Sequence, residues 1–92
     1  MNDARPLVTL FMHHDCHLCV EARAGIEALQ RELDFDLQEV DIHSDEALLR
    51  AHFERVPVVV LEGRELCCLR LDKPLLRAAL LAAGAAARAR GT

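Results

Sequence analysis

The feature that most constrains this chain is the tetrapeptide Cys16-His17-Leu18-Cys19, which lies between an apolar run, Leu7 to Met12, and a segment of helical periodicity that begins at Leu18. A strand leading into a helix brings the first cysteine to the free N–H groups and positive dipole end of the helix, where a thiolate is stabilised. The second cysteine lies on the same helix face, within disulfide reach. The pattern predicts a redox-active thiol pair.

The length and charge of the chain limit the partners of such a site. Its 92 residues predict a single domain over residues 1–92, with residues 85–92 as a helix extension or frayed tail. The 11 basic residues are scattered among 15 acidic ones, which argues against nucleic acid as a partner. Residues 1–6 do not resemble a secretory signal, and no apolar run approaches membrane-spanning length. We therefore expect a cytoplasmic monomer that does not associate with membranes.

The four cysteines are compatible with a disulfide framework, but a hydrophobic content of 52% already supplies a core. In reducing cytosol, C-x-x-C more often indicates catalysis or metal binding. Cys67 and Cys68 are adjacent in a predicted strand, so their side chains point to opposite faces and cannot act as a second C-x-x-C pair. We expect one of them to lie in the core.

Strand and helix signals alternate along the chain. Continuous or alternating apolar residues indicate strands, and apolar residues at helical spacing indicate helices. The helix between the first two strands implies a parallel crossover, and the turn at 62–65 implies a hairpin. We predict strands at 7–12, 37–42, 58–61 and 66–71, and helices at 16–33, 44–54 (capped by Ser44) and 72–84 (capped by Asp72).

The resulting order, β-α-β-α-β-β-α, with C-x-x-C after the first strand and a proline opening the third, resembles the minimal thioredoxin fold. Within that fold the chain looks most like the small glutaredoxin-like proteins. The residues that carry the resemblance are Leu10-Phe11, Cys16 to Cys19, Glu39 to Ile42, Arg55 to Val60, and Gly63. The resemblance implies a four-stranded mixed sheet with helices on both faces.

The resemblance also implies a substrate site. Pro57 is expected to be a cis proline beside the cysteines, with the backbone of Val56 free to pair with an extended peptide or with glutathione. Asp72 and Lys73 stand at the position that receives a carboxylate of glutathione. The expected partners are thiol or disulfide substrate proteins, with glutathione as a candidate co-substrate and no resident cofactor. The family's Gly-Gly pair before the last helix is missing.

The predicted activity is thiol–disulfide exchange, in which Cys16 attacks a disulfide and Cys19 resolves the mixed disulfide. His13, His14 and His17 flank the pair and are candidates for lowering the pKa of the nucleophile or for donating a proton. Two alternatives stay open. Cys16, Cys19 and the neighbouring histidines are soft and borderline donors that suit Zn²⁺ or Cu(I) in a metal-binding or metal-delivery module. The chain can also be a non-catalytic thioredoxin-fold interaction domain.

Overall fold

A computed structural model describes residues 5–88 of the chain. The elements follow the predicted order β-α-β-α-β-β-α, with one additional turn of 3₁₀ helix (η1) after the second strand. Their bounds are β1 (Leu7–Met12), α1 (His17–Gln30), β2 (Asp36–Asp41), η1 (Ile42–Ser44), α2 (Glu46–His52), β3 (Val58–Leu61), β4 (Arg64–Cys68) and α3 (Lys73–Ala82).

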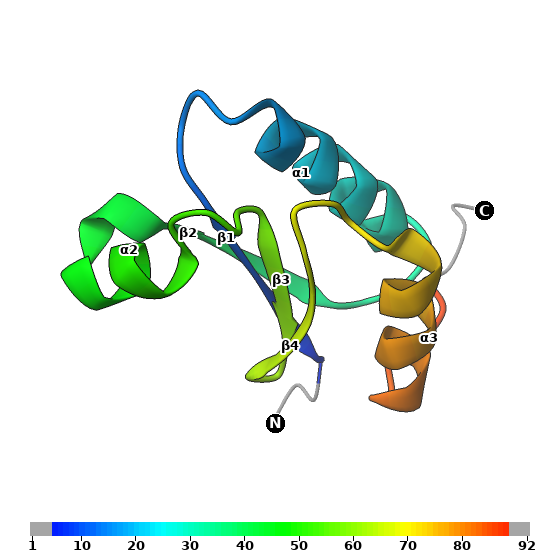
Figure 1. Cartoon of the computed structure of the whole chain (residues 1–92). Coiled ribbons are helices and arrows are strands. Elements are labelled where there is room, and N and C mark those ends of the chain that lie inside the picture. The colour runs from blue at the N-terminus through cyan, green and yellow to red at the C-terminus, as the bar shows by residue number, and fades with distance from the viewer. Residues whose placement is uncertain (1–4, 89–92) are drawn as a thin grey trace.

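The four strands form one mixed sheet in the order β2-β1-β3-β4. β1 is parallel to β2 and antiparallel to β3, and β3 is antiparallel to β4. α1 and α3 lie together on one side of the sheet, and α2 lies on the other (Figure 1). Because β1 and β2 are parallel, the chain leaves both strands at the same end of the sheet, and α1 begins there.

The main core lies between the sheet and the pair α1 and α3. The helices contribute residues spaced by three or four positions, and the strands contribute alternate residues, as an amphipathic helix packed on a sheet requires. Its fully buried members include Leu10, Ile26, Val59 and Leu80. A second, smaller cluster contains the buried Cys19, Ile42 and Val56. The smaller cluster places one cysteine of the motif in contact with the segment that precedes β3.

Several element boundaries differ from the sequence prediction by one to three residues, and the starts of α2 and β4 have a clear physical reason. Asp45, and not Ser44, caps α2, because the Asp45 carboxylate accepts a hydrogen bond from the N–H of Ala47 at 2.7 Å while the Ser44 hydroxyl donates to the carbonyl of Asp41 at 2.6 Å. β4 begins at Arg64 because the hairpin turn needs only Glu62 and Gly63, with φ of 49° and 82°. Two successive positive φ values suit a two-residue hairpin turn, and Gly63 adopts its value without strain.

Residues 85–88 form neither an extension of α3 nor a frayed end. Ala85 is buried, Ala87 forms a bridge with Leu33, and the N–H of Arg88 donates to the carbonyl of Glu32 at 2.8 Å. The remainder of the predicted tail, residues 89–92, lies outside the described residues. Within residues 5–88, no helix has the length and apolar character needed to cross a membrane.

Candidate functional site

The two motif cysteines occupy the junction between β1 and α1, as the sequence predicts. Asp15 adopts a left-handed conformation with φ of 64°, which Asp tolerates better than most residues, and it turns the chain into the helix. Cys16 is the N-cap of α1 in an extended conformation, and Cys19 lies in its first turn. The two residues form a disulfide with their Cα atoms 5.2 Å apart. In a thioredoxin-like fold, this pair fits a redox role.

The start of α1 gives the two sulfur atoms different surroundings. The sulfur of Cys16 accepts a hydrogen bond from the backbone N–H of Cys19 at 3.1 Å. Cys16 is partly exposed, whereas Cys19 is only 4% exposed. A partly exposed sulfur at a helix N-terminus is placed to meet an external disulfide as a thiolate. The buried sulfur is placed to react only with its neighbour.

The segment before β3 packs beside the cysteines, as the resemblance implies. The Val56–Pro57 peptide bond is cis. Val56 shares a hydrophobic cluster with Cys19, and Cys16 packs against that cluster. Among the described residues, no hydrogen bond engages the backbone N–H or C=O of Val56, whereas the neighbouring carbonyls of Arg55 and Pro57 both accept from the N–H of Leu69. Within the described part of the chain, the backbone N–H and C=O of Val56 are therefore unpaired beside the disulfide, in a residue that is 8% exposed.

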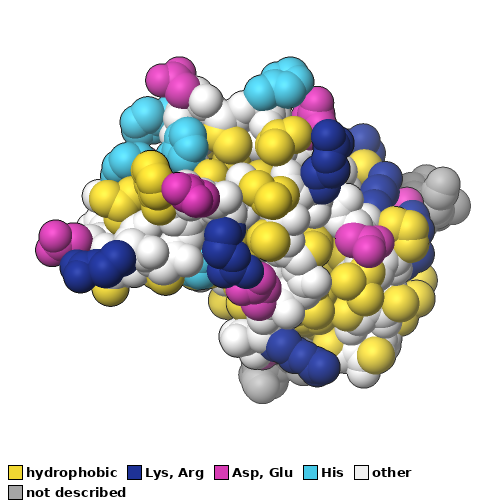
Figure 2. Space-filling view, in the orientation of Figure 1, with side chains coloured by type: hydrophobic (Ala, Val, Ile, Leu, Met, Phe, Trp, Pro, Cys, Tyr) yellow, Lys and Arg dark blue, Asp and Glu magenta, His cyan; other side chains and the backbone are white. Residues whose placement is uncertain are grey.

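The three candidate histidines have different environments. His17 lies in the first turn of α1, and its Nε2 is 2.9 Å from a carboxylate oxygen of Glu21. His13 and His14 instead line a pocket of about 230 Å³ that is also lined by Cys16 and Cys19. The histidines gather at the end of the molecule where β1 leads into α1 (Figure 2). The pocket associates His13 and His14, but not His17, with both cysteines of the motif.

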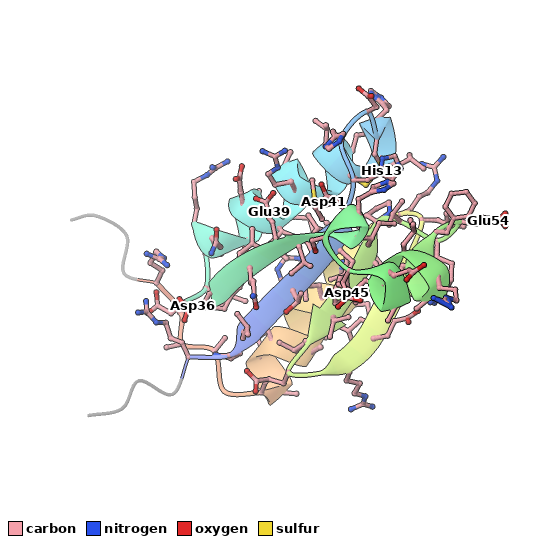
Figure 3. All side chains as sticks on the ribbon, turned by 90° about the vertical axis from the view of Figure 1, so that its left-hand side faces the viewer. His13, Asp36, Glu39, Asp41, Asp45 and Glu54 are labelled. Atoms are coloured by element: carbon pink, nitrogen blue, oxygen red, sulfur yellow. A yellow bond between two sulfur atoms is a disulfide. The ribbon has the colours of Figure 1, made fainter. Side chains whose placement is uncertain are left out.

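The sequence analysis missed Asp41 and His43, which lie beside His13 and His14 at this end of the sheet. Asp41 is the last residue of β2 and His43 lies in η1 just after it, and Figure 3 shows Asp41 close to His13. The parallel crossover was a usable signal, because parallel strands end at the same edge of a sheet and ligand sites collect there. Finding the two residues required the register that pairs Met12 with Asp41.

Asp72 and Lys73 stand at the start of α3, as predicted. The Asp72 carboxylate caps the helix, accepting from the N–H of Leu75 at 3.1 Å. Lys73 lines a pocket of about 270 Å³ together with Leu18 of the cysteine motif and Arg70. The structure therefore brings Lys73 to the cysteine motif, while it engages the carboxylate of Asp72 in capping. Arg70 adds a second cation that the sequence analysis had not singled out.

The remaining cysteines lie in β4 with free thiols. Cys67 packs against the main core, as expected for one of the pair. Burial raises the pKa of the Cys67 thiol, although the backbone N–H of Asp72, 3.5 Å from the sulfur, acts in the opposite direction. The metal alternative receives no geometric support: across residues 5–88, no three His, Cys, Asp or Glu side chains are grouped to hold a metal ion.

Comparison with known proteins relates this arrangement to relatives of similar length. The protein Rv0508 of Mycobacterium tuberculosis is 36% identical to this chain over 80 residues, which cover 82% of each protein. The solution structure of Ne2328 from Nitrosomonas europaea matches with a TM-score of 0.75 and 33% identity, covering 87% of this chain and 99% of that one. The X-ray structure of XcR50 from X. campestris matches with a TM-score of 0.68 and 38% identity, covering 82% and 96%.

A more distant similarity shows the fold. Thioredoxin from Fasciola hepatica matches with a TM-score of 0.62 at 21% identity, covering 87% of this chain and 82% of that one. A family model described as "Glutaredoxin-like domain (DUF836)" matches residues 7–81, which include every strand of the sheet and both cysteines of the motif. The chain therefore has the thioredoxin fold and belongs to the glutaredoxin-like domain family.

Proposed function

We propose that the protein is a dithiol thiol–disulfide oxidoreductase, with Cys16 as the nucleophile and Cys19 as the resolving cysteine. The observation that carries the proposal is the contrast between the two sulfur atoms. Cys16 is partly exposed, and its sulfur accepts the N–H of Cys19 at 3.1 Å, whereas Cys19 is 4% exposed. After reduction, the same N–H and the helix dipole favour a thiolate at Cys16.

The exchange proceeds in two steps. The Cys16 thiolate attacks one sulfur of a substrate disulfide, which forms a mixed disulfide and releases the other substrate sulfur as a thiolate. Cys19 then attacks the sulfur of Cys16, which forms the Cys16–Cys19 disulfide and releases the second substrate thiol. A separate thiol donor reduces the protein again.

Substrate binding is assigned to the surfaces beside the disulfide. The free backbone N–H and C=O of Val56, held next to the cysteines by Pro57, suit an extended peptide that adds to the sheet as a short strand. Lys73 and Arg70 suit the carboxylates of glutathione or of an acidic substrate, and Asp72 fixes the start of α3 that carries Lys73. Protein disulfides and glutathione mixed disulfides are therefore the proposed substrates.

Three histidines are proposed to add positive charge near the nucleophile. His13 and His14 do so from the pocket that they share with the cysteines, and His17 does so from within the motif. An imidazolium near a thiol favours its ionised form. The Glu21 carboxylate partly offsets the charge of His17, and the Asp41 carboxylate that of His14, so the larger contribution is assigned to His13.

The deciding experiment is a redox titration of the Cys16–Cys19 pair against glutathione buffers, in a background with Cys67→Ser and Cys68→Ser. We expect a reversible two-electron transition between about −200 and −270 mV, as in glutaredoxins and thioredoxins. Cys16→Ser should abolish reductase activity, and Cys19→Ser should trap the mixed disulfide. If wild-type protein does not form the disulfide in oxidising buffer, the proposal is wrong and an interaction domain becomes the better description.

A further inference from the structure

The ends of β1 and β2 bring four side chains together beside the cysteines: Asp41, His13, His14 and His43, called here the Asp41–histidine cluster. His13 and His14 follow β1 directly, and Asp41 is the last residue of β2. The parallel register pairs Met12 with Asp41, so these segments leave the sheet side by side. Figure 3 shows His13 and Asp41 at the same end of the sheet, with Asp36 at the other end of β2.

Asp41 holds this cluster together through both of its carboxylate oxygens. Its Oδ1 accepts the backbone N–H of His43 at 2.9 Å, and its Oδ2 is 3.6 Å from Nδ1 of His14. The ring of His43 stacks on that of His14, with centroids 6.3 Å apart, and meets the ring of His13 edge-on at 5.9 Å. A carboxylate facing Nδ1 favours the tautomer that leaves Nε2 free to accept a proton.

The pocket next to the cluster is lined by Cys19, the less exposed cysteine of the motif. Cys19 is 4% exposed, yet it lines the pocket of about 230 Å³ together with Cys16, His13 and His14. A water molecule occupies about 30 Å³ of liquid, so this pocket, which His14 and Cys19 both line, has room for water. When a substrate covers Cys16, this pocket offers Cys19 a route for losing its proton.

We propose that His14, oriented by Asp41 and His43, accepts the proton of Cys19 during resolution of the mixed disulfide. This assignment rests on the proposed function and concerns its second step. The proton passes from the Cys19 thiol, through water in the pocket, to Nε2 of His14. The Cys19 thiolate then forms a bond to the sulfur of Cys16, the bond between Cys16 and the substrate sulfur breaks, and the departing thiolate takes the proton from His14.

The other charged groups around the pocket are less suited to this transfer. Arg23 and Glu39 also line it, but their side chains pair with each other at 3.6 Å. Asp15 also lines the pocket, but a carboxylate is a much weaker base than an imidazole. The Nδ1 of His13 contacts the carbonyl oxygen of His14, so this nitrogen faces the backbone instead of a carboxylate. Of the two imidazoles that line the pocket, only His14 has a carboxylate facing its Nδ1, and that negative charge favours the imidazolium formed when the ring accepts a proton.

The test follows the resolving step directly, in the Cys67→Ser, Cys68→Ser background. Reduced protein is mixed with oxidised glutathione, quenched with acid at intervals, and analysed by mass spectrometry for the glutathione adduct and the intramolecular disulfide, from pH 5.5 to 9. We expect His14→Gln and Asp41→Asn each to slow conversion of the adduct by about tenfold at pH 7. The difference in conversion rate between variant and wild type should disappear towards pH 9, because hydroxide and direct ionisation of the Cys19 thiol then make the imidazole unnecessary.

The two groups should act as one unit, so the double variant should be no slower than either single variant. Asp36→Asn, at the far end of β2, is the matched control and should convert at the wild-type rate. The inference is overturned if His14→Gln converts within twofold of wild type throughout the pH range, or if the two effects multiply. Should Asp41→Asn fail to fold by circular dichroism, His14→Gln, in an exposed loop, decides alone. A wild-type protein that never forms the intramolecular disulfide would instead refute the proposed function.

Discussion

Cys16 is an unusual N-cap, and its role in the helix is tied to its charge. Ser, Thr, Asp and Asn are the preferred capping residues, because their oxygens accept the free N–H groups of the first turn. A thiol sulfur is a weak acceptor, whereas a thiolate is a strong one. Ionisation of Cys16 should therefore strengthen the hydrogen bond from Cys19 and the first turn of α1 at the same time.

The capping role predicts different stabilities for two inactive variants. Cys16→Ser retains a capping oxygen, whereas Cys16→Ala removes the acceptor. We expect Cys16→Ala to unfold with about 1 kcal/mol less free energy than Cys16→Ser in urea titrations. Both variants lack the disulfide, so its loss cancels in the comparison. Equal stabilities would show that the hydrogen bond at Cys16 contributes nothing to α1.

Cys67 should react slowly despite being a free thiol. Burial raises the pKa of Cys67, so the thiol stays protonated to a higher pH than an ordinary cysteine. Its neutral form favours the folded state at low pH, and this contribution is lost as the pH rises through the raised pKa. With Cys16 and Cys19 oxidised, we expect iodoacetamide to alkylate Cys67 several-fold more slowly in folded than in urea-unfolded protein at pH 8.

The difference between the alkylation rates of Cys67 in folded and in urea-unfolded protein should become smaller as the pH is raised above 8. Peptide mapping by mass spectrometry distinguishes Cys67 from Cys68, and Cys67→Ser identifies the signal. Equal rates in folded and unfolded protein at pH 8 would contradict the effect of burial on this thiol.

At the scale of elements, local sequence signals predicted the fold, because each helix and strand carries its own periodicity. β1 has its predicted bounds, and Asp72 caps α3 as predicted. The errors lie where two local signals compete or where a partner strand decides. Ser44 and Asp45 are both good capping residues, and only the contact between Ser44 and Asp41 separates them. The start of β4 depends on its pairing with β3.

The candidate site likewise combines residues that local sequence signals predict with residues that only the folded structure brings together. The cysteine pair and Pro57 are recognisable because their spacing is local or matches a family pattern. The contacts of His14 with Asp41 and His43 join residues far apart in the sequence. They depend on strand register and side-chain rotamers, neither of which the linear pattern specifies.

Substitutions at Gly25 test how closely α1 approaches the segment before α3. A Cβ atom built at Gly25 would lie 2.5 Å from the Cδ2 atom of Leu71, so that methyl group must move. Leu71 borders the pocket of about 270 Å³ and can shift towards it. Because alanine favours a helix over glycine by about 1 kcal/mol, we expect Gly25→Ala to raise the free energy of unfolding by a few tenths of a kcal/mol.

A larger side chain at this position should have the opposite effect. Gly25→Val adds branched methyl groups against Leu71 and should destabilise the protein by about 1–3 kcal/mol. Ala24→Gly, at the neighbouring exposed helix position, calibrates the helix propensity in the same helix. Thermal unfolding of the three variants measures the differences. If Gly25→Ala lowers the stability of the protein as much as Gly25→Val does, the Leu71 side chain cannot move.

At the scale of the whole molecule, both hydrophobic clusters should contribute to stability, but only the smaller one contains a cysteine of the motif. Leu80 is fully buried in the main core between α3 and the sheet, and Ile42 is fully buried in the smaller cluster with Cys19. We expect Leu80→Ala and Ile42→Ala each to lower the free energy of unfolding by about 2–5 kcal/mol.

Only Ile42→Ala should also change the reduction potential of the Cys16–Cys19 pair, because it alters the packing around one sulfur. Urea unfolding and redox titration of both variants test this division. An equal change of potential in the two variants would mean that the disulfide responds to overall stability and not to its own cluster.

The open edge of the sheet at β2 bears on whether two copies of the protein can associate. β2 is an edge strand, paired only with β1, and it carries the exposed carboxylates Asp36 and Glu39. An open edge is a template for any extended chain, including an identical molecule. Two copies meeting through β2 would set carboxylates against carboxylates, whereas a foreign chain need not. The exposed carboxylates of β2 therefore disfavour edge-to-edge pairing of two copies through this strand.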